Sequence, residues 1–211
     1  AVRTGHESAG DAGADGMKSL VYVFHGIFWS TFLLRAIRRG KREAIGEVRS
    51  ASAAVHKTRR AWPALLVHAI GFGAMYAGID GVMSAPVEPK LLFALPPAIG
   101  ASIILLGAAI LAWALVVFDS WRILAQLDQG HRLCTRGPYQ FVRNPIYLAC
   151  DFLALGSFLW IPTWETLFGL VFMHLGGELR ARTEEKLLAQ AFGEDYRRYR
   201  EGTGRFLPKF G

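Results

Sequence analysis

Two short stretches near the C-terminal end of the chain hold the residues whose types and spacing are best suited to chemistry. Residues 136–147 read RGPYQFVRNPIY and lead into an apolar segment, and residues 183–199 read TEEKLLAQAFGEDYRRY and contain paired carboxylates. The first stretch predicts a turn and a helix N-terminus at the mouth of an apolar span, and a helix N-terminus attracts carboxylate or phosphate groups. Together the two stretches predict a cofactor site at a membrane surface.

The first stretch predicts a helix that begins at Pro145. Asn144 is a favourable N-cap residue and Pro145 a favourable first helical residue. Asn144, Tyr147 and Asp151 follow at i, i+3 and i+7, which places them in one stripe along that helix. The alternative is a capped helix whose Asp pairs with a neighbour. Polar residues inside a membrane span are functional by default, so the stripe is a candidate site.

The next predicted helix carries a second group of charged residues. Arg180 and Glu184 are four residues apart, as are His174 and Glu178, so each pair shares one face of a helix. For Glu185 the favoured interpretation is an exposed helical face with surface ion pairs. For His174 the favoured interpretation is a satisfied histidine with a packing role.

These motifs require membrane helices to position them. The 211 residues are 52% hydrophobic and 19% charged, with a mean hydropathy of +0.26, which is typical of membrane proteins. A helix needs about 20 apolar residues to cross a bilayer core of about 30 Å. The sequence predicts an all-α integral membrane protein with about five transmembrane helices and a C-terminal interfacial amphipathic helix. The predicted spans are residues 19–34, 61–79, 91–118, 145–161 and 162–180.

The rest of the chain is assigned around these spans. Residues 1–16 are rich in Gly, Ala and Asp, which predicts a disordered tail. Residues 17–130 are expected to hold the first three membrane helices, with a basic cytoplasmic loop at 35–60. Residues 131–211 are expected to form the binding and catalytic region, with the last two membrane helices and the C-terminal helix. Pro96 and Pro97 mark a kink in the third span or its start.

The distribution of positive charge predicts the orientation. Of the 24 Lys and Arg residues, 21 lie in alternate loops that would share one side of the membrane. The positive-inside rule then places the N-terminus outside the cytoplasm and the C-terminus and both motif stretches inside it. Topology and anionic lipid therefore account for the net charge of +7, and we expect no nucleic acid partner.

Residues 131–208 resemble the isoprenylcysteine carboxyl methyltransferase family and its wider kin, which include the phospholipid N-methyltransferases. The family pattern is a His-x-Leu, a Gly-x-Tyr, an Arg-His-Pro-x-Tyr, and an Arg four residues before a Glu-Glu pair that is followed by Phe-Gly-x-x-Tyr. In this chain the pattern falls on His131 and Leu133, Gly137 and Tyr139, Arg143 to Tyr147, and Arg180 with Glu184 and Glu185.

The resemblance implies an integral membrane enzyme that binds S-adenosylmethionine in a cytoplasm-facing pocket and methylates a lipid-borne or prenylated acceptor. It implies catalytic roles for Arg180 and Glu184, and acceptor contacts from Arg180, Asp151 and Glu178. It implies no metal. The residues expected to contact the cofactor are His131, Arg132, Leu133, Cys134, Tyr139, Asn144, Pro145, Ile146, Tyr147, Glu184 and Glu185.

Two alternatives stay open. Asn144 stands where carboxyl methyltransferases carry His, and Asn-Pro at this point is closer to the phospholipid-methylating branch, so the acceptor can be an amine. Arg180 would then grip a phosphate while Asp151 or Glu178 took the proton. The other alternative is a non-catalytic membrane scaffold or small transporter, with Asp151 and Glu178 as pathway residues.

The charge distribution makes a topological prediction. Lys90 should lie outside the cytoplasm and the residues after Pro208 inside it, because most basic residues lie on one side. Single-cysteine labelling of intact cells checks this. Labelling of position 209 by a probe that cannot cross the membrane would contradict the orientation.

Overall fold

The computed structural model describes residues 7–44, 54–57, 61–84, 92–118, 126–128 and 133–209. Within these residues it has five α-helices, one 3-10 helix and a two-stranded antiparallel ribbon, so the expected helical fold is confirmed with a small addition. The elements are α1 (Glu7–Ala44), β1 (Ala54–Lys57), α2 (Ala61–Ser84), α3 (Pro97–Val117), β2 (Gln126–Asp128), η2 (Gly137–Gln140), α4 (Pro145–Trp160) and α5 (Trp164–Gly202).

Three of the described helices are long and apolar enough to cross a membrane. These spans are Ser19–Arg38 within α1, Trp62–Ser84 within α2 and Pro97–Val117, which is α3. Helix α4 is apolar but only 16 residues long, and the 39 residues of α5 include both its apolar part and its charged C-terminal part. Large apolar side chains lie exposed on the outer faces of α1, α2 and α3, as expected for surfaces in contact with lipid. The chain is an integral membrane protein.

Some boundaries differ from those predicted. Helix α1 begins at Glu7, inside the segment expected to be a disordered tail, and ends at Ala44, inside the segment expected to be a loop. The extension at its C-terminal end is rich in Ala, Arg, Lys and Glu, which favour helix even without an apolar pattern. Helix α3 begins at Pro97, so the proline pair marks the start of this helix and not a kink.

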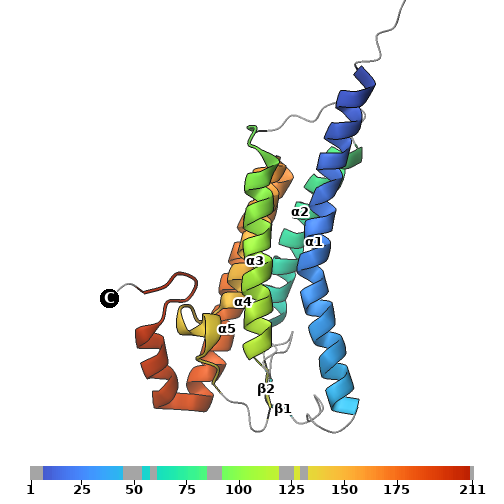
Figure 1. Cartoon of the computed structure of the whole chain (residues 1–211). Helices are drawn as coiled ribbons and strands as arrows, with labels where there is room; N and C mark the ends of the chain where they lie inside the picture. Colours follow the sequence, from blue (N-terminus) through green and yellow to red (C-terminus); the bar gives the residue numbers. More distant parts are fainter. Residues whose placement is uncertain are drawn as a thin grey trace, which may run out of the picture.

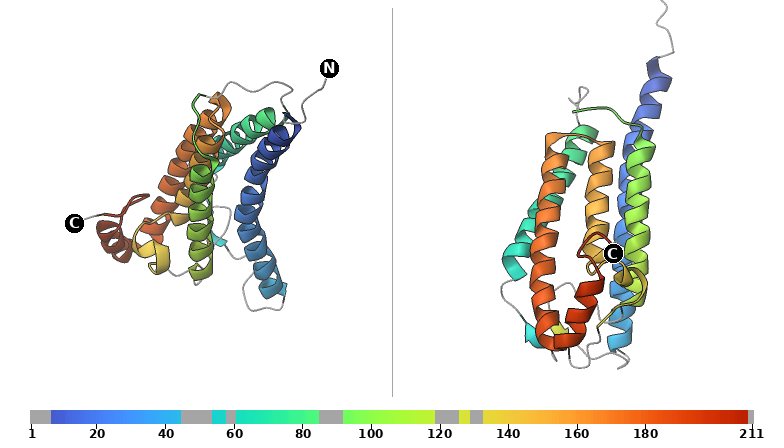
Figure 2. Two further views of the ribbon diagram at one scale, coloured as in Figure 1. Left: turned by 45° about the horizontal axis from the view of Figure 1, so that its top comes forward. Right: turned by 90° about the vertical axis from the view of Figure 1, so that its left-hand side faces the viewer.

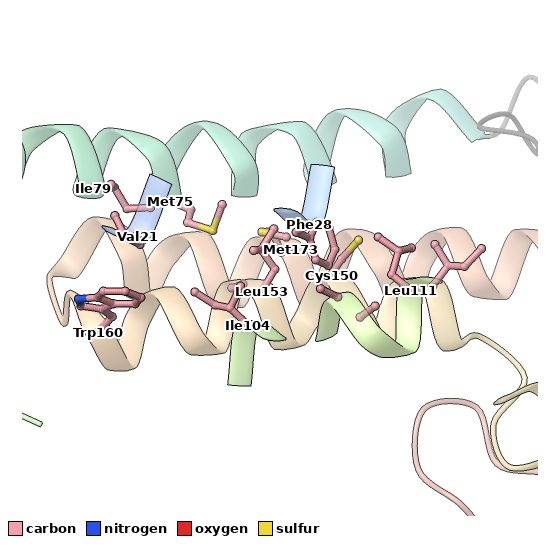
Figure 3. Close-up of a cluster of buried hydrophobic side chains, with 14 of the residues drawn as sticks. Val21, Phe28, Met75, Ile79, Ile104, Leu111, Cys150, Leu153, Trp160 and Met173 are labelled. Atoms are coloured by element: carbon pink, nitrogen blue, oxygen red, sulfur yellow. The ribbon is translucent and has the colours of Figure 1, made fainter. Parts of the chain in front are cut away.

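The five helices form a bundle in which α2 packs along α5 and α3 packs along α4 (Figure 1). Helix α4 also contacts α5, so these two pairs are joined, and α1 lies at one edge of the bundle against α3 (Figure 2). The buried apolar side chains between the helices form one cluster. Figure 3 shows part of it, including Val21, Phe28, Met75, Ile79, Ile104, Leu111, Leu153 and Met173.

Glycines at seven-residue intervals bring α2 and α5 into backbone contact. A Cβ added at Gly71 would lie 2.5 Å from the backbone nitrogen of Met173, and one added at Gly78 would also collide with α5. On the facing helix, a Cβ at Gly169 or Gly176 would lie 2.7 Å or 2.6 Å from the nearest atom of α2. Small residues in such positions let membrane helices approach closely and gain dispersion contacts.

The same device joins α3 to α4. A Cβ at Gly100 would lie 2.5 Å from the carbonyl oxygen of Gly156, and one at Gly156 would lie 2.6 Å from that of Gly100. Two helical turns further along α3, a Cβ at Gly107 would lie 2.9 Å from the carbonyl oxygen of Ala149. We call these two glycine-lined contacts, α2 with α5 and α3 with α4, the glycine seams. Each seam limits how far one helix can shift along its partner.

The turn between α4 and α5 and the end of α5 are set by local sequence. Thr163 and Thr166 form a capping box at the start of α5, which satisfies backbone N–H groups that no helical carbonyl reaches. Gly193 has a φ of 49°, which breaks the helical geometry within α5. The chain beyond it turns back as a separate short helical segment (Figure 1), where the sequence predicted a C-terminal helix.

The glycine seams yield a test with a matched control on one helix. Gly71→Ala should lower the stability of the protein by about 1–3 kcal/mol, because the added methyl group has no room beside α5. Gly73→Ala should be neutral or stabilising by up to about 1 kcal/mol, since nothing lies within 4 Å of its added Cβ. Thermal unfolding in detergent measures both. Equal shifts for the two variants would contradict the close packing of α2 on α5.

Candidate functional site

A cavity of about 400 Å³ lies among α1, α2, α4 and α5. Its walls are mostly apolar and include Trp29 and Phe32 from α1 and Phe72 from α2. The polar groups at the cavity come from three different helices, and they are His68, Tyr147 and Arg180. Such a chamber suits an apolar ligand that carries a small number of polar groups.

Tyr147 connects this cavity to the paired carboxylates. The guanidinium carbon of Arg180 lies 5.1 Å from the centroid of the Tyr147 ring, a cation–π distance. The hydroxyl group of the same tyrosine donates a hydrogen bond of 2.5 Å to Oε1 of Glu184. The stripe predicted on α4 and the Arg180–Glu184 pair predicted on α5 therefore meet at one side chain.

Glu184 has the environment of a ligand-binding carboxylate. Burial raises its pKa above the ordinary value, while the charge of Arg180 and the hydrogen bond from Tyr147 act in the opposite direction. Among the described residues, the hydrogen bond to this carboxylate reaches only Oε1. The residue is partly exposed, so a ligand could approach this carboxylate.

Glu185 is buried, with 7% of its surface exposed, so its interpretation as a surface ion pair is wrong. Its Oε1 accepts hydrogen bonds from Arg143 at 3.1 Å and Asn144 at 3.0 Å, and its Oε2 accepts one from Arg205 at 2.9 Å. Burial alone would raise the pKa of Glu185, but the bond from Arg205 and the charge of Arg143 outweigh it and lower the pKa. We call these four residues the clasp.

The clasp ties the end of the chain to the start of α4. The backbone N–H of Arg143 donates to the carbonyl oxygen of Gly204 at 2.8 Å, and that of Asn144 donates to Arg205 at 3.2 Å. Asn144 occupies the N-cap position as predicted, but its side chain makes no capping bond. Its amide instead donates to Glu185, because a bond to a carboxylate is stronger than a neutral one.

Asp151 and Glu178 lie outside the set of residues that line the cavity. Oδ2 of Asp151 lies 3.0 Å from Nδ1 of His174, and Glu178 pairs with Arg182 and Arg205. His174 and Glu178 were expected to share one face of the helix, and the partner of His174 is Asp151 on the neighbouring helix α4. The His174 side chain is 53% exposed, so it pairs at the surface and is not a core residue.

The remaining predicted cofactor residues lie before and at the start of α4. The backbone carbonyl of Tyr139 accepts a hydrogen bond of 2.7 Å from the Tyr199 hydroxyl, and burial raises the pKa of Tyr139 well above its ordinary value. The thiol of Cys134 lies 3.7 Å from the carbonyl oxygen of Val117 at the end of α3. Ile146 lines the cavity, Pro145 is buried and Leu133 is partly exposed. His131 and Arg132 lie outside the described residues.

The sequence interpretation missed His68, Arg205 and the aromatic residues of the cavity wall. His68 carried a usable signal, because it is the only histidine in an otherwise apolar predicted span. Trp29, Phe32 and Phe72 carried none, since aromatic residues are ordinary in membrane helices. Arg205 gave no signal either, because only the fold-back of the chain brings it to Glu185.

The chain was compared with known proteins. Residues 95–195 match the model of a family described as phospholipid methyltransferase. A relative, Protein-S-isoprenylcysteine O-methyltransferase from Schizosaccharomyces pombe (strain 972 / ATCC 24843), is 31% identical over 88 residues. That match covers 41% of this chain and 37% of the relative, so less than two thirds of the relative's length is represented. Both findings agree with the family that the motifs indicated.

The clasp predicts a large and pH-dependent effect on stability. Glu185→Gln should lower the free energy of unfolding by about 3 kcal/mol at neutral pH, because it leaves buried Arg143 without its counter-charge. The pKa of Glu185 is lowered by folding, so its contribution is present above the unfolded pKa of about 4.3 and is lost as pH falls below it. Denaturant unfolding at neutral and acidic pH measures this difference. Glu201→Gln, on the exposed face of the last helical segment, should change little, and an equal loss would contradict the role of the clasp.

Proposed function

We propose that this chain, which belongs to a family of membrane methyltransferases like isoprenylcysteine carboxyl methyltransferase, transfers a methyl group from S-adenosylmethionine to a lipid-like or prenylated acceptor. The observation that carries this proposal is the position of Tyr147, which joins the carboxylate of Glu184 to the guanidinium of Arg180 at the wall of an apolar cavity. A site for a charged donor and a site for an apolar acceptor thereby share one side chain.

The residues around Glu184 fit S-adenosylmethionine chemically. The free oxygen of Glu184 suits the ammonium group of its methionine part, and the N-terminus of α4 at Pro145 suits the carboxylate. The tyrosine rings at 139 and 147 suit its adenine and sulfonium groups. When bound, S-adenosylmethionine supplies an electrophilic methyl group. The family pattern is the basis for proposing that the segment His131–Cys134 also contacts the cofactor. Glu185 holds the start of α4 beside Glu184.

The cavity is the proposed place of the acceptor. Its apolar walls suit an acyl or prenyl chain, and Arg180 on its wall suits the anionic group of such a molecule. A prenylated carboxylate would be held directly by Arg180 and is already ionised at neutral pH. A phospholipid amine is the second candidate, favoured by the family description and by Asn144 at the position where carboxyl methyltransferases carry His.

We further propose that the site faces the cytoplasm, with the N-terminus on the other side of the membrane. The support is the concentration of basic residues in alternate loops, together with the position of Arg143 and Arg205 at the same end of the bundle as Glu184. The region from residue 131 onward would then form the catalytic part. Asp151 and Glu178 keep an acceptor-side role only as a prediction, since neither lines the cavity.

The donor and acceptor roles separate by mutation. Glu184→Ala should weaken S-adenosylmethionine binding by about tenfold to a hundredfold, because a charge-assisted bond contributes about 1.5–3 kcal/mol, and Tyr147→Phe should weaken it less. Arg180→Leu should leave this affinity largely intact and abolish transfer. Titration calorimetry and methyl transfer to a native lipid extract measure the two effects, with Glu194→Ala as an exposed control. Unchanged binding by folded Glu184→Ala, or full activity of Arg180→Leu, would refute the assigned roles.

A further inference from the structure

We infer that His68 accepts the proton lost by a protic methyl acceptor, namely an amine or a thiol carried on an apolar chain. The inference rests on the proposed function and narrows its substrate class. It starts from a buried polar atom that the fold leaves unsatisfied. His68 is 3% exposed, and its Nδ1 has no hydrogen-bond partner among the described residues. A buried group in this state costs about 1–3 kcal/mol, so a bound partner is strongly favoured.

The cavity is where such a partner would bind. His68 lines it together with Tyr147 and Arg180, and a half-turn of the imidazole ring exchanges the positions of Nδ1 and Cδ2, which moves this nitrogen to the other side of the ring. The ring stacks on Phe72, with centroids 5.1 Å apart and planes at 26°, and lies 6.2 Å from the Tyr147 ring. These contacts hold the imidazole at the end of the cavity that contains the Tyr147–Arg180 contact.

The backbone of α5 fixes the same histidine in place. A Cβ added at Gly176 would lie 2.6 Å from the backbone and Cβ of His68, so the two helices touch at this point. Gly176 lies one turn before Arg180 on α5. The distance between the imidazole and the guanidinium is therefore set by helix packing and not by flexible loops.

Other groups at the cavity are poor proton acceptors. From α5 the charged group is Arg180, whose guanidinium has donor groups and no acceptor. From α4 the titratable groups are Tyr147, whose hydroxyl already donates to Glu184, and Cys150, a buried thiol. From α1 the cavity receives apolar side chains and Trp29, whose indole N–H donates to another residue, Tyr76.

Imidazole is suited to the task that remains. A neutral imidazole carries a lone pair on one ring nitrogen, and that nitrogen can accept a proton. Asp151 and Glu178, the carboxylates expected from the sequence to take this proton, lie outside the cavity lining and are engaged by His174, Arg182 and Arg205. Among the described residues that line the cavity, His68 is thus the one with a basic ring nitrogen that has no hydrogen-bond partner.

The step balances in atoms and charge. A bond forms between the nucleophilic nitrogen or sulfur of the acceptor and the methyl carbon, and the sulfonium sulfur keeps the electron pair of the broken S–C bond. The proton of the nucleophile passes to the imidazole of His68, which becomes cationic and later releases the proton to water. A carboxylate acceptor would need no such residue, because it has no proton to lose at neutral pH.

The experiment compares His68→Gln with the wild-type protein over a range of pH, with phosphatidylethanolamine vesicles, a long-chain alkyl thiol and S-farnesylcysteine as acceptors. With the thiol or amine, His68→Gln should lower kcat about 10²- to 10⁴-fold and change KM little. The deficit should shrink as pH rises toward the acceptor's own pKa, because a deprotonated nucleophile needs no base. His174→Gln, a histidine away from the cavity lining, should keep the wild-type pH profile.

Two further measurements separate chemistry from folding. His68→Ala should regain part of its activity with added imidazole, and it should reduce the thermal shift that the alkyl thiol produces in cofactor-free protein. A deficit that does not vary with pH, a failure of imidazole to restore activity, or methylation by the wild-type protein of the S-farnesylcysteine carboxylate alone would overturn the inference. Absence of S-adenosylmethionine binding by the wild-type protein would instead overturn the proposed function.

Discussion

The direct contact between the backbones of α2 and α5 is the constraint on which the site depends. Lipid supplies little hydrophobic force between membrane helices, so their association relies on close packing, and the glycines of this seam permit it. The contact at Gly176 sets His68 beside the turn that carries Arg180, and Tyr147 of α4 fits against that turn. Aligning the backbones of α2 and α5 thereby places His68 and Arg180 at one cavity, where Tyr147 of α4 also lies.

Two adjacent carboxylates on α5 have different environments. Glu184 and Glu185 are about 100° apart around α5, so one faces Tyr147 and the other faces the N-terminal side of α4. The pKa of Glu184 is raised by burial, whereas Arg205 and Arg143 lower the pKa of Glu185. Glu185 joins α5 to the start of α4, and Glu184 is the carboxylate that we propose for ligand binding.

Sequence patterns predicted the parts of this protein that depend on local rules. The start of α4 at Pro145 and the helical fold follow from capping, proline and apolar length, whereas the sequence left the proline pair at 96 and 97 open between a kink and the start of α3. The state of Glu185 could not be predicted, because its burial depends on Arg205, twenty residues away beyond a chain reversal. The cavity could not be predicted either, because four helices form it and the sequence of one segment does not determine how they pack together.

The proposed methyl transfer needs no covalent nucleophile, so the protein would have to supply orientation and exclusion of water. The clasp contributes to orientation from a distance. Arg205, from the last described segment, bonds Glu185 and Glu178 on α5, while the backbone beside it pairs with the residues that precede α4. Glu184 lies between Glu178 and Glu185 in the sequence of α5. The described segment after α5 thus supports the start of α4 and the part of α5 that carries Glu184.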